Sequence, residues 1–145
     1  NNNLQYTNMS YPILTKKYHF CASHKYGNPD WSEKKNLEVF GKDYNNHGHN
    51  YVLEVSVTGP VNPDTGWLVD LGHLNQIVKS NVVNILDHSQ IEKDIKWFKG
   101  KQPSSEVLVE WIWSQIEKDF REAKLHRIRL VETPTIHTDY YGPQH

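Results

Sequence analysis

The sequence predicts one α+β domain in which an antiparallel four-stranded sheet carries two helices on one face. Three observations predict this class. Two segments near the N-terminus alternate between apolar and polar residues, two later segments repeat apolar residues at helical spacing, and two alternating segments close the chain. The expected order is therefore strand, strand, helix, helix, strand, strand, and 145 residues fit a single domain of this kind.

The domain is expected to cover residues 11–145. Residues 1–10 are polar, contain four asparagines and show no hydrophobic period. A segment of this composition has too little apolar surface to pack, so a disordered extension is expected there.

The first two strands are predicted at residues 13–23 and 47–58 from their alternation. His24 follows the first strand on its apolar face. Residues 25–46 contain several turn-forming residues, so a loop is expected there, with a short extended piece at 37–40. A connection this long is uncommon in a small domain unless it is functional.

The two helices are predicted to begin near Asp70, a good N-cap residue, and near Ser104, which follows Pro103. Between them, residues 87–101 are irregular and polar. The closing strands are expected at 126–132 and 136–141. The apolar stripes of the helices comprise Leu74, Ile77, Val78, Val82 and Ile85 in the first, and Val107, Leu108, Trp111, Ile112 and Ile116 in the second.

Composition excludes several classes of protein. A net charge of −1 argues against a nucleic-acid binder that works by charge alone. The single cysteine, Cys21, excludes an internal disulfide framework and a zinc site built from several thiolates. No stretch approaches the ~20 apolar residues of a membrane span, and no signal segment opens the chain, so a cytoplasmic protein is expected.

Three histidines form a candidate metal site. His47 and His49 begin a strand, and residues two apart on a strand project to the same face. His24 ends the preceding strand, so antiparallel pairing would place it beside this pair. Three imidazoles with an open fourth position are what a catalytic zinc requires.

Four further residues are candidates for catalysis or binding. Asp87 next to His88 suits general acid–base work, although capping of the preceding helix by His88 is an equal alternative. Glu132 ends an apolar strand, where its carboxylate can accept two parallel N–H bonds from an aminopyrimidine edge. Glu106 lies in the first turn of the second helix and also suits the helix dipole.

Seven spaced motifs closely resemble the 6-pyruvoyl-tetrahydropterin synthase family, which includes the 6-carboxytetrahydropterin synthases. In chain order they are FCASHKY (20–26), NLEVFGK (36–42), HGHNY (47–51), DTGWLVDL (64–71), LDHSQI (86–91), PSSEVL (103–108) and VETP (131–134). The resemblance runs from about Tyr18 to Gly142.

The resemblance implies a tunnelling fold (T-fold) whose subunits join their sheets into a barrel and assemble as hexamers, with the site between subunits. It implies zinc held by the three histidines and a pterin pocket anchored by Glu132, with Glu106 nearby. It also gives Asp87 and His88 a proton-relay role.

One position departs from the family pattern. Members with an FGK segment usually continue with a relay cysteine, whereas here Asp43 follows, and the loop to HGHNY is about two residues short. A free aspartate, with a pKa near 3.9, accepts a proton but donates one poorly. One branch of the family carries glutamate at this position, and Glu38 is a second candidate for that carboxylate. Cys21 lies on the opposite strand face and is interpreted as structural.

The leading hypothesis is a zinc-dependent lyase that converts 7,8-dihydroneopterin triphosphate to 6-pyruvoyl-tetrahydropterin or 6-carboxytetrahydropterin. Asp43, Asp87 and His88 would move protons and Glu132 would hold the ring. The alternatives are cleavage of the side chain to a 6-hydroxymethyl pterin, a pterin-binding protein without catalysis, and a structural zinc protein.

Overall fold

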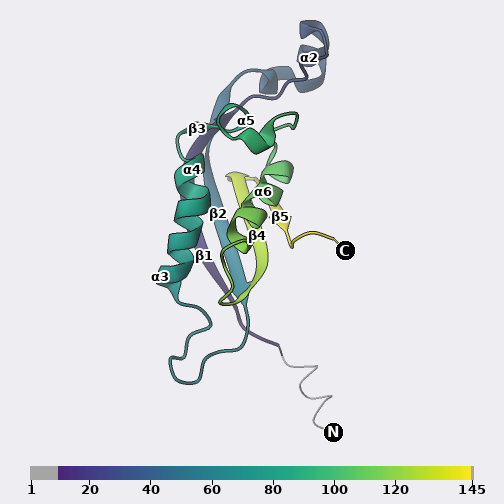
Figure 1. Cartoon of the computed structure of the whole chain (residues 1–145). Coiled ribbons are helices and arrows are strands. Elements are labelled where there is room, and N and C mark those ends of the chain that lie inside the picture. Colours follow the sequence, from purple (N-terminus) through teal and green to yellow (C-terminus); the bar gives the residue numbers. More distant parts are fainter. Residues whose placement is uncertain (1–9, 145) are drawn as a thin grey trace.

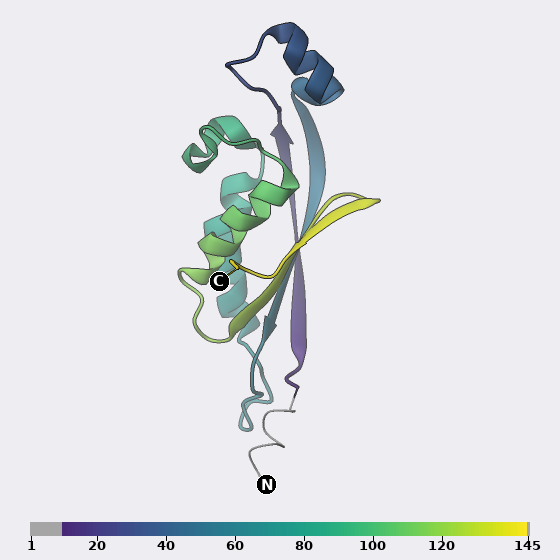
Figure 2. The same cartoon turned by 90° about the vertical axis from the view of Figure 1, so that its right-hand side faces the viewer.

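The computed structural model describes residues 10–144 and consists of a five-stranded sheet with helices packed on one face (Figures 1 and 2). The strands are β1 (Ile13–His24), β2 (His47–Thr58), β3 (Ser89–Gln90), β4 (Lys124–Thr133) and β5 (Ile136–Tyr140). The helices are α2 (Glu33–Phe40), α3 (Leu71–Val78), α4 (Asn84–Leu86), α5 (Ile91–Asp94) and α6 (Ser105–Glu117). The strand order is β3-β1-β2-β4-β5.

The long hairpin of β1 and β2 forms the centre of the sheet. The two strands pair antiparallel along their whole length, from Ile13 opposite Thr58 to His24 opposite His47. Alternate residues of both strands face the helices and are buried, as the alternation predicted. They comprise Tyr18, Phe20, Ala22 and His24 from β1, and Tyr51, Leu53, Val55 and Val57 from β2.

The predicted N-cap at Asp70 and the predicted helix start at Ser104 are both confirmed. The Asp70 carboxylate accepts from the N–H of Gly72, and the Ser104 hydroxyl accepts from the N–H of Val107. Ile85, expected in the core, is instead 42% exposed. A π-helical turn at Lys79–Val83 separates α3 from α4 and shifts the helical phase, so Leu86 rather than Ile85 is buried in the core.

Two expectations about secondary structure are wrong. The sheet has five strands rather than four, because Ser89–Gln90 pairs parallel with β1 at Ala22 and Ser23. Residues 37–40 are the end of α2 and are not extended, since Ser32 caps this helix by accepting from the N–H of Lys35. Except for Ser10, the extension expected at residues 1–10 lies outside the described residues.

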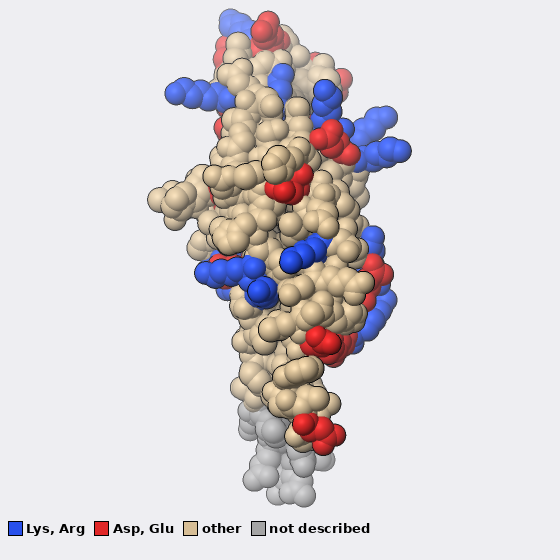
Figure 3. Space-filling model, turned by 90° about the vertical axis from the view of Figure 1, so that its left-hand side faces the viewer, with Lys and Arg blue, Asp and Glu red and all other residues tan. Residues whose placement is uncertain are grey.

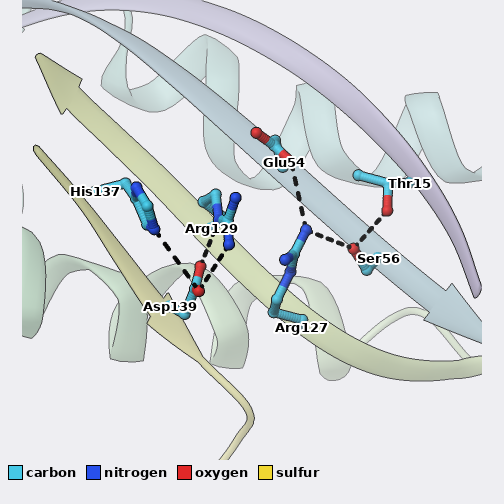
Figure 4. Close-up of polar contacts among 7 residues, drawn as sticks. All are labelled: Thr15, Glu54, Ser56, Arg127, Arg129, His137 and Asp139. Carbon is cyan, nitrogen blue, oxygen red and sulfur yellow. Dashed lines mark hydrogen bonds and ion pairs between the residues drawn. The ribbon is translucent and has the colours of Figure 1, made fainter. Parts of the chain in front are cut away.

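The face of the sheet turned away from the helices carries a polar network (Figure 4). Arg129 donates two hydrogen bonds to Asp139, at 2.7 and 3.0 Å. Arg127 donates to Glu54 at 3.3 Å, and also to Ser56, which shares a hydrogen bond with Thr15. These contacts connect β1, β2, β4 and β5 on the face of the sheet that is turned away from the helices.

Basic and acidic side chains are intermixed on the surface seen in Figure 3. This distribution agrees with the near-zero net charge. Within residues 10–144, none of the helices is both long and apolar enough to cross a membrane.

Candidate functional site

Three imidazoles meet at the end of the β1–β2 hairpin. His24 is the last residue of β1, and His47 and His49 are the first and third residues of β2. The ring centroid of His24 lies 4.5 Å from that of His47 and 5.0 Å from that of His49. One ring nitrogen from each histidine lies within 4.8 Å of the other two. The antiparallel register therefore brings together all three predicted metal ligands.

Hydrogen bonds fix the orientation of two of these rings. The Nδ1 atoms of His24 and His47 each lie 2.8 Å from a backbone carbonyl oxygen, of Pro103 and Asn45 respectively. A carbonyl oxygen only accepts, so each Nδ1 carries the proton and each Nε2 presents a lone pair. This is the arrangement in which a histidine ligates a metal through Nε2 while a carbonyl fixes its tautomer.

The surroundings of His24 fit a bound cation. Its side chain is 1% exposed, and its Nε2 has no hydrogen-bond partner among the described residues. Burial lowers the pKa of His24, which favours the neutral form that coordinates metals. A buried lone pair without a partner is costly, and a divalent cation between the three rings would satisfy it.

Carboxylates gather beside the histidines around Tyr26. Burial raises the pKa of the Tyr26 hydroxyl, and the negative charges of Glu132, Glu106 and Asp43 raise it further. Glu132 also accepts a hydrogen bond of 3.2 Å from the hydroxyl of Ser105, the buried first residue of α6. The structure thus brings Glu132, Glu106 and Asp43 to the same end of the sheet as the three histidines.

Asp43 lies next to one of the imidazoles. It belongs to the 3₁₀ turn Gly41–Tyr44 that precedes β2, and its Oδ1 is 3.6 Å from Nε2 of His47. Glu38, the second candidate for this carboxylate, is exposed on α2, where it lies 4.0 Å from the ammonium group of Lys34. Asp43 is therefore the better placed of the two.

Asp87 and His88 form a pair on the other side of β1. His88 Nδ1 lies 2.9 Å from the Asp87 carboxylate, whose second oxygen accepts from the N–H of Cys21 at 2.8 Å. This backbone hydrogen bond, followed by the contact with His88, lowers the pKa of Asp87. No hydrogen bond or ion pair between described residues joins the pair to the three histidines.

The backbone of His88 turns this ring outward. Its φ is +64°, a left-handed conformation that is uncommon for a residue other than glycine. The side chain is 83% exposed and borders a hollow of about 350 Å³ that also touches Gly48 and His49.

Sequence reasoning missed Tyr51, Tyr26 and Ser105. Tyr51 is 1% exposed, and its hydroxyl has no partner among the described residues. Its ring centroid is 5.6 Å from that of His49, and the charge of Glu132 adds to burial in raising its pKa. The alternation His47, His49, Tyr51 was a usable signal for Tyr51. For Tyr26 and Ser105 the sequence contains no signal that separates them from ordinary loop and helix residues.

Comparison with known proteins identifies the family of this chain. The sequence profile of the family described as "6-pyruvoyl tetrahydropterin synthase" matches residues 13–143. The 6-pyruvoyl tetrahydrobiopterin synthase of Drosophila melanogaster is 33% identical over 90% of this chain and 80% of its own length. That of Dictyostelium discoideum is 35% identical over 90% and 96%.

A solved structure gives the same result for the fold. The 6-pyruvoyl tetrahydropterin synthase of Caenorhabditis elegans superposes with a TM-score of 0.86 at 30% identity, covering 93% of this chain and 98% of that one. The T-fold expected from the sequence motifs is confirmed by this match. This chain belongs to the 6-pyruvoyl tetrahydropterin synthase family.

Proposed function

We propose that this protein is a zinc-dependent lyase that converts 7,8-dihydroneopterin triphosphate to a 6-substituted pterin, either 6-pyruvoyl-tetrahydropterin or 6-carboxytetrahydropterin. The observation that carries the proposal is the buried, unpartnered Nε2 of His24 beside His47 and His49, with the Glu132 carboxylate at the same end of the sheet. The two relatives are named 6-pyruvoyl tetrahydrobiopterin synthases, and this supports a pterin as the class of substrate.

In this proposal His24, His47 and His49 hold the ion. A bound zinc ion supplies Lewis-acid chemistry, which polarises side-chain oxygens of the substrate and makes its carbon-bound proton more acidic. Glu132 accepts hydrogen bonds from the amino-pyrimidine edge of the pterin, and Ser105 orients it from the start of α6.

Proton transfer is assigned to Asp43 and to the Asp87–His88 pair. The Asp43 carboxylate accepts a proton. His88, whose Nδ1–H is held by the Asp87 carboxylate, accepts a proton at Nε2 and can then return it from the imidazolium. The Asp87–His88 pair precedes β3, which lies along the edge of β1 opposite to β2. We therefore infer that the pair transfers protons at the histidine site of a neighbouring copy in a hexamer.

Product analysis tests the proposed function. The zinc-loaded protein is incubated with 7,8-dihydroneopterin triphosphate, beside Glu132→Gln and Asp43→Cys variants, and the pterins are identified by mass spectrometry. We expect the wild type to form one defined product and Glu132→Gln to lose most turnover, because an amide presents only one acceptor oxygen.

The outcomes separate the alternatives. A 6-hydroxymethyl pterin would assign the side-chain cleavage reaction. Binding without turnover in the wild type, together with turnover in Asp43→Cys, would assign a pterin-binding protein. Zinc content near zero after gentle purification, with no gain on adding zinc, would overturn the metal role.

A further inference from the structure

We propose that Asp43 is a fourth protein ligand of the cation held by His24, His47 and His49 when substrate is absent. The inference rests on the proposed metal site and adds to it, since a site of three histidines alone would leave the fourth position to water. It depends on an aspartate at position 43 and on the short turn Gly41–Tyr44 that carries it.

The first argument is distance. In the proposed site His47 coordinates through Nε2, because Nδ1 of the same ring is hydrogen-bonded to the carbonyl oxygen of Asn45. The Asp43 Oδ1 lies 3.6 Å from this Nε2. Two ligands bound to one tetrahedral zinc at ordinary bond lengths are separated by about 3.3–3.5 Å. The carboxylate is thus already near the separation that shared coordination requires.

The second argument is the backbone that carries the carboxylate. The carbonyl of Asp43 accepts from the N–H of Tyr26 at 2.9 Å, which ties the turn to the segment directly after His24. The same turn supplies the Asn45 carbonyl that orients His47. One short segment therefore places both the imidazole and the carboxylate, at the end of the sheet where the other two histidines lie.

The third argument is freedom of the side chain. Among the described residues, the group of nitrogens within 4.8 Å of one another comprises the three histidines without Asp43, and the side chain of Asp43 contacts only His47. Its side chain is 60% exposed and makes no other hydrogen bond or ion pair within residues 10–144. Rotation of this side chain toward the centre of the triad breaks no other contact, and the positive ion offsets the carboxylate charge.

Ligation at rest also explains how one group serves two steps of the proposed function. Substrate oxygens displace the carboxylate from the ion. The freed carboxylate then stands beside the substrate, where it accepts a proton. An amide or a hydroxyl at position 43 would be a weaker ligand of the ion and a weaker proton acceptor.

Metal binding tests the inference without activity. The metal is removed by chelator, and the affinity for Zn²⁺ is measured by competition with a chromophoric chelator. We expect Asp43→Asn to weaken binding about 10–100-fold, the range seen when groups that support a metal site are lost. Glu38→Gln is the matched control, since Glu38 is an equally exposed carboxylate on the adjacent helix, and it should leave the affinity unchanged.

Cobalt substitution gives a direct readout. In Co²⁺-loaded Asp43→Cys, a thiolate at position 43 should produce a sulfur-to-cobalt charge-transfer absorption in the near ultraviolet that the wild type lacks. The band should persist when Cys21→Ser is added, because the Cys21 side chain lies on the opposite face of β1 and donates a hydrogen bond to Asn50.

Equal zinc affinity in the wild type and Asp43→Asn, or absence of the sulfur band from a folded Asp43→Cys that binds cobalt, would overturn the inference. Failure of the wild type to bind any metal would instead overturn the proposed function. Circular dichroism of each variant shows whether it is folded.

Discussion

At the scale of single residues, neighbouring groups decide what an ordinary side chain can do. The protein has nine histidines, and two of the three at the end of the hairpin have Nδ1 held by a carbonyl oxygen. Burial lowers the pKa of His24, and its Nε2 has no hydrogen-bond partner among the described residues. These features distinguish a potential ligand from histidines that are hydrogen-bonded at the surface, such as His73 with Glu122.

Loss of one imidazole should abolish stable metal binding. His49→Ala leaves the buried His24 in place but removes a ligand, so we expect zinc per chain to fall from about one to near zero after dialysis, as in other sites that lose a ligand. Elemental analysis of the dialysed protein measures this. His19→Ala, an exposed histidine on the other face of β1, should retain the zinc. Full zinc in His49→Ala would contradict the predicted site.

Removal of the Tyr51 hydroxyl should cost the free protein little. The hydroxyl is buried without a partner, and deleting an unsatisfied polar group is close to neutral or stabilising. Tyr51→Phe should therefore change the free energy of unfolding by no more than about 0.5 kcal/mol, measured by urea titration of the metal-free protein. A loss near 2 kcal/mol would mean that the hydroxyl has a partner in the free protein.

At the scale of elements, the start of α6 organises much of the site. The Pro103 carbonyl orients His24, Ser104 caps the helix, and Ser105 contacts Glu132. A helix that begins at a fixed residue thus aligns His24, a proposed metal ligand, with a carboxylate from β4. The polar network on the opposite face of the sheet aligns β4 with β5 in a similar way (Figure 4).

The cap of α6 gives the third prediction. Ser104→Ala removes the acceptor for the N–H of Val107 and should lower the free energy of unfolding by about 1 kcal/mol. Ser104→Asp retains a capping oxygen and should stay within a few tenths of the wild type. Both values come from urea unfolding. Equal stability of all three proteins would show that the cap contributes nothing.

The Arg129–Asp139 pair should make the free energy of unfolding depend on pH in the acidic range. Arg129 lowers the pKa of Asp139 below its ordinary value of 3.8 through two hydrogen bonds. The contribution of a carboxyl with a lowered pKa is present above its unfolded-state pKa and is lost as the pH falls through the folded-state value.

Asp139→Asn should thus be less stable than the wild type by about 1 kcal/mol at pH 6, and the difference should shrink toward pH 3. Thermal unfolding across this range measures it. Asp64→Asn, in an exposed turn, should show no such trend. A difference between wild type and Asp139→Asn that is constant with pH would contradict the assignment.

At the scale of the whole molecule, the site residues are divided between two sides of β1. The three histidines lie at the end of the β1–β2 hairpin, whereas Asp87 and His88 precede β3, on the other side. Within residues 10–144 the outer strands also leave free edges, because β5 pairs only with β4 and β3 covers only two residues of β1. Free edges of this length favour pairing with another copy.

Mixed assemblies test whether two copies share a site. His49→Ala and His88→Ala should each be inactive alone. Co-expressed with different tags and purified as mixed assemblies, they should regain activity, because about a quarter of the sites would combine an intact triad with an intact pair. Native mass spectrometry gives the number of copies. Mixed assemblies that stay inactive would place both groups at one site within a chain.

Much of the fold could be predicted from the sequence. The alternation in residues 47–58 matches β2 residue for residue, and α3 and α6 begin where they were predicted to begin. Local pattern suffices there, because strand and helix periods are properties of consecutive residues. It failed at α2, where a polar stretch with turn residues hid a short capped helix, and at β3, whose two residues are a strand only because β1 lies beside them.

By itself the sequence determined the α+β class, the hairpin that brings His24 opposite His47, and the family, because these depend on period, order and motif. Only the tertiary structure decided which nitrogens are free, that Tyr26 and Tyr51 border the site, and that Asp43 rather than Glu38 lies beside His47. It also decided that Asp87 and His88 lie across β1. Burial, tautomer and distance arise from contacts between residues far apart in the chain, and no local pattern encodes them.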